Sequence, residues 1–174
     1  MGHSGNTSEL AYEAFEMYGF SLEYPDTWEI ELRPHSTAAA GDLAFKSRSG
    51  RVFLTWGSLE KMKKKFGSLD RQAEDGVKRM RKSGAVRRFE ILDHREMNVN
   101  GHRSIFNSTR LTIAAGLMGM RTAQREVCSL HLHCDPSQKF FVLYANGIGE
   151  QSEVAILDVF FRMSSTLRCH QTQF

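Results

Sequence analysis

The first third of the chain alternates apolar and polar residues with the period of a β-strand. In YGFSLEYPDTW the alternating apolar positions, which predict a strand with one buried face, are Phe20, Leu22 and Tyr24. Pro25 should end this strand, because proline has no N–H to donate to a neighbour, and Trp28 should pin the turn onto a core. The pattern in this third predicts five strands: Tyr12–Met17, Phe20–Tyr24, Trp28–Leu32, Leu43–Ser47 and Val52–Trp56.

The middle of the chain changes to a helical period. A polar helical region is expected from Leu59 to Lys82, broken near Gly67, with Ser68 as the N-cap of its second half. That half carries a narrow apolar stripe on an otherwise charged helix, formed by Leu69, Ala73, Val77 and Met80.

The second half returns to strands and ends in a helix. Asn100-Gly101 predicts a tight hairpin, because both turn positions need positive φ. The strands expected here are Phe89–Val99, His102–Ile113, Arg121–Cys134 and Lys139–Ala145. The helix from Glu150 to Leu167 presents one broad apolar face, with Ile156, Phe160, Met163 and Leu167 at its centre.

These elements predict an α+β fold, a curved antiparallel β-sheet meander flanked by α-helices. We expect one antiparallel sheet to contain the Phe20–Tyr24 strand together with the four strands of the second half. Four side chains are predicted to be largely buried: Phe20, Trp28, Leu132 and Phe160.

Length and composition fit one ordinary domain. The chain has 174 residues, 41% of them hydrophobic and 25% charged, so a disordered or fibrous class is excluded. We expect a flexible lead over residues 1–10, a single domain over 11–168 and a tail over 169–174. No apolar run approaches the ~20 residues of a membrane helix, and the N-terminus has no apolar signal core, so a cytoplasmic location is expected.

The three cysteines favour a reducing compartment. Cys128 and Cys134 lie in one expected strand, about 20 Å apart at the rise of an extended chain, too far for a disulfide. Cys169 could approach either of them, but the odd count favours buried thiols.

The order of elements and several motifs resemble the PsbP-like superfamily, which includes the photosystem II protein PsbP and the Mog-type release factors for the GTPase Ran. The resemblance covers roughly residues 12–168. Its opening motif is carried by Gly19, Phe20, Ser21, Leu22, Tyr24, Pro25 and Trp28, and its hairpin motif by Val99, Asn100 and Gly101. The resemblance implies the fold and a binding or accessory role without enzymatic activity. It implies no particular functional residues.

Positive charge is concentrated between Lys61 and Arg88, which we call the basic segment. It holds eleven lysines and arginines against three acidic residues, a local charge of +8 in a chain whose total is +3. Such a concentration can steer an acidic partner protein, nucleic acid or an anionic membrane surface, whereas the alternative is a solvated helix face. Its single aromatic residue, Phe66, argues against nucleic acid. The candidate partner-binding residues are Lys61, Lys63, Lys64, Lys65, Lys78, Arg79, Arg81, Lys82, Arg87 and Arg88.

A second candidate is the strand segment CSLHLHC, residues 128–134. Alternation puts its two cysteines on one face and His131 and His133 on the other. Two histidines at this spacing can bind zinc only with a further ligand, which His94, Glu96 or His102 could supply from neighbouring strands. We predict no metal site, at His131 and His133 or elsewhere in the chain, and no cofactor.

Catalytic signatures are missing from the sequence. It has no nucleophile elbow, no phosphate-binding glycine-rich loop and no His-Glu-x-x-His motif. We therefore expect a non-enzymatic domain that binds an acidic protein. Two alternatives stay open: a small-molecule or lipid pocket between sheet and helix, and an enzyme with a dispersed site.

Overall fold

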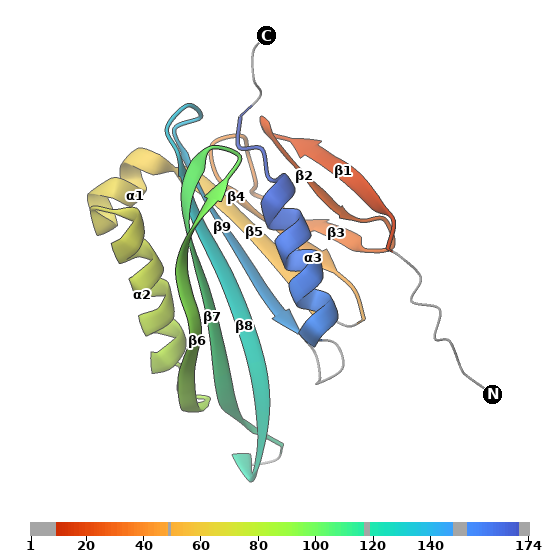
Figure 1. The fold of residues 1–174 in the computed structure, drawn as a ribbon, viewed down its shortest axis with the longest axis vertical. Helices are drawn as coiled ribbons and strands as arrows, with labels where there is room; N and C mark the ends of the chain where they lie inside the picture. The colour runs from red at the N-terminus through yellow and green to blue at the C-terminus, as the bar shows by residue number, and fades with distance from the viewer. Residues whose placement is uncertain (1–9, 49, 117–118, 148–152, 171–174) are drawn as a thin grey trace, which may run out of the picture.

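A computed structural model describes residues 10–48, 50–116, 119–147 and 153–170. Two β-sheets and three helices make up the described chain (Figure 1). In chain order the elements are β1 (Tyr12–Met17), β2 (Phe20–Pro25), β3 (Glu29–Leu32), β4 (Gly41–Lys46), β5 (Gly50–Ser58), α1 (Leu59–Phe66), α2 (Leu69–Lys82), β6 (Val86–Val99), β7 (His102–Ala115), β8 (Arg121–Cys134), β9 (Lys139–Gly147) and α3 (Glu153–Thr166).

The main sheet has seven strands in the order β3-β4-β5-β9-β8-β7-β6. Every strand pair in the two sheets is antiparallel. The predicted α+β class is therefore confirmed, and no parallel crossover joins the described strands.

Two details of the predicted sheet are wrong. The strand at Phe20–Tyr24 does not join the main sheet but pairs with β1 in a separate two-stranded sheet. The strands also do not follow one another throughout, because β5 pairs with β9 and the chain re-enters the sheet at its far edge as β6. Alternation reveals which face of a strand is buried, but it does not identify the neighbouring strand.

The β6–β7 hairpin forms where the sequence predicts it. Asn100 and Gly101 have φ values of 48° and 86°, and Val99 pairs with His102 across the two-residue turn. Positive φ at both positions matches the twist of the flanking strands, so the predicted hairpin is confirmed.

One face of the main sheet is covered by α3 and by the β1–β2 hairpin (Figure 1). The predicted apolar face of α3 is buried, with each of its four central side chains at most 4% exposed. Phe20 from the hairpin packs against the rings of Trp56 and Phe141, at centroid distances of 5.1 and 5.4 Å. The predicted core is confirmed, since the exposed fractions are 1% for Phe20, 9% for Trp28, and 0% for Leu132 and Phe160.

The opposite face is covered by α1 and α2. Gly67 has a φ of 80° and separates the two helices, and the Ser68 hydroxyl accepts a hydrogen bond of 3.3 Å from the backbone N–H of Arg71. The predicted break and N-cap are both confirmed. Leu69 and Ala73 of the apolar stripe are buried against Ile105 of β7.

The packed chain continues beyond residue 168, where the sequence places the end of the domain. The segment after α3 bridges to β2 through two backbone hydrogen bonds between Ser21 and Arg168, of 2.9 and 2.8 Å. Cys169 follows this bridge and is only 2% exposed. Residues 1–9 of the expected lead lie outside the described residues. No helix in the described ranges is long and apolar enough to cross a membrane.

Candidate functional site

The ten candidate residues of the basic segment all have exposed side chains. They lie on α1, on the C-terminal half of α2 and at the start of β6. Three of the ten pair with carboxylates: Lys63 with Asp135 at 2.9 Å, Lys64 with Glu60 at 2.6 Å and Arg79 with Asp75 at 2.6 Å. The other seven have no acidic partner in the described part of the chain.

The two helices of the basic segment meet around one aromatic ring. The Lys65 ammonium lies 5.0 Å from the centroid of Phe66, and the Arg79 guanidinium lies 5.9 Å from the same centroid. Both distances are within the range of a cation–π contact. Phe66 thus brings a cation from α1 and a cation from α2 together on one part of the surface.

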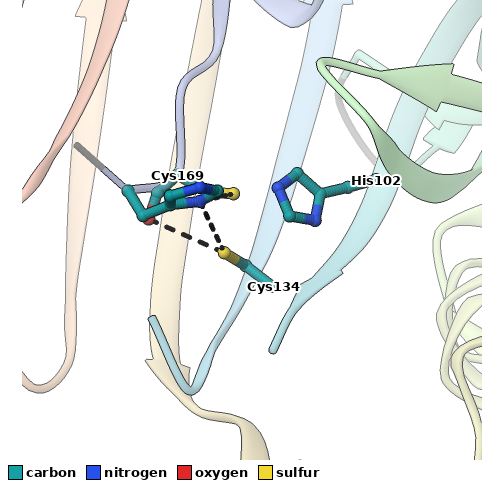
Figure 2. A group of neighbouring side chains, drawn as sticks. His102, Cys134 and Cys169 are labelled. Atoms are coloured by element: carbon teal, nitrogen blue, oxygen red, sulfur yellow. Dashed lines mark hydrogen bonds between the residues drawn. The ribbon is translucent and has the colours of Figure 1, made fainter. Parts of the chain in front are cut away.

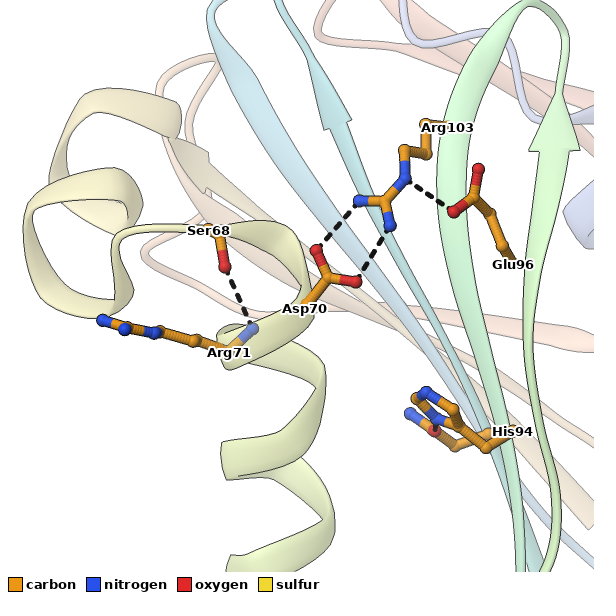
Figure 3. A network of polar contacts seen from close by, with 7 residues as sticks. Ser68, Asp70, Arg71, His94, Glu96 and Arg103 are labelled. Carbon is orange, nitrogen blue, oxygen red and sulfur yellow. Dashed lines mark hydrogen bonds and ion pairs between the residues drawn. The ribbon is translucent and has the colours of Figure 1, made fainter.

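An arginine-centred network holds the N-terminal end of α2 against the β6–β7 hairpin (Figure 3). Arg103 donates two hydrogen bonds to the Asp70 carboxylate, of 3.0 and 2.9 Å, and a third of 2.8 Å to Glu96. The hydrogen bonds from Arg103 hold the pKa of Asp70 below its usual value. Because a bidentate guanidinium–carboxylate pair fixes direction as well as distance, the network orients α2 and the cations that it carries.

The histidines and cysteines of β8 lie on opposite faces, as alternation predicts. The histidines face α2, whereas Cys128 and Cys134 face α3. His133 contacts the Gln72 side-chain oxygen of α2 at 2.6 Å. His131 is 5% exposed and lies beneath Gly76, where an added Cβ would stand 3.4 Å from the imidazole ring. Neither histidine belongs to a group of three or more close metal-binding side chains in the described ranges.

Burial makes His131 a neutral imidazole. It lowers the pKa of His131 from 6.5 to about 4, and the neighbouring His133 adds to the effect. Desolvation also lowers the pKa of His133. The Nδ1 atom of His131 has no hydrogen-bond partner within the described chain. The face of β8 that α2 covers therefore carries polar side chains, one of which has an unpaired polar atom.

Four metal-binding side chains come together on the opposite face of the sheet, at the C-terminal end of β8: His102, Cys134, Cys169 and His170 (Figure 2). Each offers one donor atom, and these four atoms all lie within 4.8 Å of one another. The Nδ1 atom of His170 lies 3.4 Å from the sulfur of Cys134 and 3.7 Å from that of Cys169. We call these four residues the Cys/His cluster.

The two thiols of the Cys/His cluster are inequivalent. The interaction between the two thiols lowers the pKa of Cys134 and raises the pKa of Cys169. Both cysteines are buried, with exposed fractions of 0% and 2%.

The sequence predicts only part of the Cys/His cluster. Alternation puts Cys134 on the opposite face from His131, and Cys169 could approach Cys134, but His102 is a candidate only as a further ligand for His131 and His133. The register of β7 and β8, in which Ser104 pairs with Leu132, brings His102 level with Cys134. The neighbouring metal-binding residues Cys169 and His170 are the other feature of the sequence that could have indicated this cluster.

No protein-family model and no curated protein sequence matches the chain. Solved structures do match it, and they define the class as the PsbP-like α+β fold, which confirms the predicted fold. The cyanobacterial PsbP of Synechocystis has a TM-score of 0.63 at 12% identity, covering 97% of this chain and 98% of its own. The Ran-binding protein Mog1p of Saccharomyces cerevisiae has a TM-score of 0.62 at 7% identity, covering 92% and 96%.

A third similar structure is a putative regulator, protein PA94 of Pseudomonas aeruginosa, whose function is unknown. Its TM-score is 0.53 at 11% identity, and the match covers 92% of this chain and 99% of that protein. At these identities the likeness establishes the fold alone, since one fold hosts unrelated functions.

Proposed function

We propose that this domain acts by protein–protein contact, without catalysis, and that the basic segment binds an acidic partner protein. The observation that carries the proposal is the exposure of all ten candidate cations, seven of them without an acidic partner in the described ranges. Unpaired surface charge of one sign raises the rate at which an oppositely charged partner arrives. The similar structure of the Ran-binding protein Mog1p supports a contact role for the fold.

The two alternatives have less support. The apolar face of α3, which motivated a small-molecule or lipid pocket, is packed into the core at Phe160 and Met163, both 0% exposed. An enzyme with a dispersed site would need reactive groups in an accessible cleft. The Cys/His cluster does lie beside a cleft, but its sulfur atoms are buried.

We also propose a reducing location such as the cytoplasm. All three cysteines are free and buried, which fits a compartment where disulfides do not persist.

Reversing the charge of Lys78, Arg81 and Lys82 to glutamate should lower the association rate constant with the partner by about tenfold or more. These three residues carry no ion pair in the described chain, so their replacement breaks no intramolecular contact of that kind. Surface plasmon resonance against partners captured from the native host would measure both rate constants. Raising the salt concentration should weaken wild-type binding, because charges are screened over about 8 Å at physiological ionic strength.

The matched control reverses Arg33, Arg48 and Arg51, which are exposed near β3 to β5. This variant has the same net charge as the first one. A partner lost equally by both variants would indicate a nonspecific charge effect, and a partner kept by both would show that the basic segment is only a solvated face.

A further inference from the structure

The Cys/His cluster has the composition of a structural zinc site. Two cysteines and two histidines form one of the common four-ligand sets for zinc, with tetrahedral geometry. Thiolate and imidazole together select soft or borderline metals such as zinc over magnesium or calcium, which prefer oxygen ligands. The four donor atoms within 4.8 Å of one another include two sulfur and two nitrogen donors.

The observed spacing is close to that of a filled tetrahedron. Zinc–sulfur bonds of about 2.3 Å and zinc–nitrogen bonds of about 2.0 Å put neighbouring donors about 3.3–3.8 Å apart. The two distances from His170 Nδ1 to the sulfurs, 3.4 and 3.7 Å, already fall in this range. The other pairs need to shorten by about 1.5 Å at most to reach it, since all four donor atoms lie within 4.8 Å of one another.

Three parts of the fold hold the donors in place. His102 begins β7, Cys134 ends β8, and Cys169 and His170 follow α3. The Asn100 side chain in the β6–β7 turn donates hydrogen bonds to the carbonyls of Ser165 and Leu167, of 3.1 and 2.8 Å. Together with the bridge between Ser21 and Arg168, these bonds position the chain segment that carries two of the four donors.

The surroundings provide a route for a metal ion. A cleft of about 290 Å³ is lined by Asn100, His102, Arg168, Cys169 and His170. The two histidines are half-buried and line this cleft together with Cys169, so an ion can enter through it. Figure 2 shows the His102 ring directed toward the two cysteine side chains.

We propose that His102, Cys134, Cys169 and His170 bind one zinc ion, which fastens the segment after α3 to the ends of β7 and β8. The site is structural, because four protein ligands leave no open coordination position for a substrate. A metal that binds only the folded chain stabilises it. The proposal does not depend on the function of the basic segment, which lies on the opposite face of the sheet.

The test uses untagged full-length protein, dialysed after exposure to zinc. Elemental analysis should find stoichiometric zinc, and cobalt substitution should give the visible absorption bands of a tetrahedral ion with thiolate ligands. Adding a strong chelator should lower the melting temperature, and returning zinc should restore it.

Single variants separate the site from adventitious binding. Cys134→Ser and His170→Gln should lose the stoichiometric zinc and the cobalt spectrum, whereas Cys128→Ala, a buried cysteine of the same strand outside the cluster, should keep both. His170→Gln keeps the test decisive if Cys134→Ser fails to fold, because His170 is half-buried near the end of the chain. Zinc retained by a folded His170→Gln variant, no zinc in the wild type, or a Cys134–Cys169 disulfide detected by thiol titration would each overturn the proposal.

Discussion

Replacing Phe160 by alanine should lower the free energy of unfolding by about 3–5 kcal/mol. Phe160 is 0% exposed and occupies the centre of the α3 face that packs on the sheet. Its ring lies 6.1 Å from that of Phe106 in β7 and 5.8 Å from that of Phe161. Truncation removes both contacts and leaves a cavity between helix and sheet that well-packed neighbours can fill only partly. Urea denaturation at fixed pH measures the change.

Met120→Ala provides the comparison for this core variant. Met120 is 79% exposed, so its truncation should change the unfolding free energy by less than about 0.5 kcal/mol. If Phe160→Ala cost less than about 1 kcal/mol, α3 would not contribute to the core in the way its burial indicates.

The elements that the sequence predicted well are those set by local chemistry. Asn100-Gly101 encodes a tight turn because two neighbouring residues must adopt positive φ, and a distant partner has little influence on that requirement. Ser68 likewise caps α2 through the backbone N–H of a residue three positions later. Side-chain periodicity was equally informative for the last helix, because all four side chains at the centre of its predicted apolar face are buried.

Strand pairing was less predictable because it depends on residues far apart in the sequence. β5 and β9 pair from Gly50–Gly147 to Ser58–Lys139. The sequence of neither strand indicates which other strand it pairs with. Phe20–Tyr24 alternates like a strand of the main sheet, yet β2 pairs with β1 and Phe20 packs across the sheet face onto Trp56. Both arrangements satisfy the same hydrophobic pattern.

The Cys/His cluster shows the same limit for a site. Cys134 and Cys169 are 35 positions apart in the sequence, and His102 reaches them only because of the β7–β8 register. Adjacency in the sequence is also a poor guide to this site. His133 is next to Cys134 in the chain, but its side chain points to the other face of the sheet. The exposure of the basic segment was easier to anticipate, because a helix with so narrow an apolar stripe must expose most of its cations.

Acidification from pH 6.5 to about 4 should remove about 3 kcal/mol of stability through His131. Burial lowers the pKa of this histidine from 6.5 to about 4, so the folded state resists a proton that the unfolded chain takes up. Its contribution is complete above the unfolded pKa of 6.5 and is lost as the pH falls toward the folded value. Because the unfolded state binds more protons in this window, the unfolding free energy rises with pH.

The contribution of His131 is isolated by comparing the wild type with His131→Gln, with chelator present so that metal release adds nothing. Glutamine does not titrate, so the unfolding free energy of the variant should depend less steeply on pH between 4 and 6.5, by up to about 1.4 kcal/mol per pH unit. NMR titration of the His131 ring protons provides a direct reading of the same quantity. A midpoint near 6.5, or equal slopes for the two proteins, would mean that the imidazole beneath Gly76 is open to water. A midpoint near 4 would make the contact between α2 and β8 a pH-sensitive part of the fold.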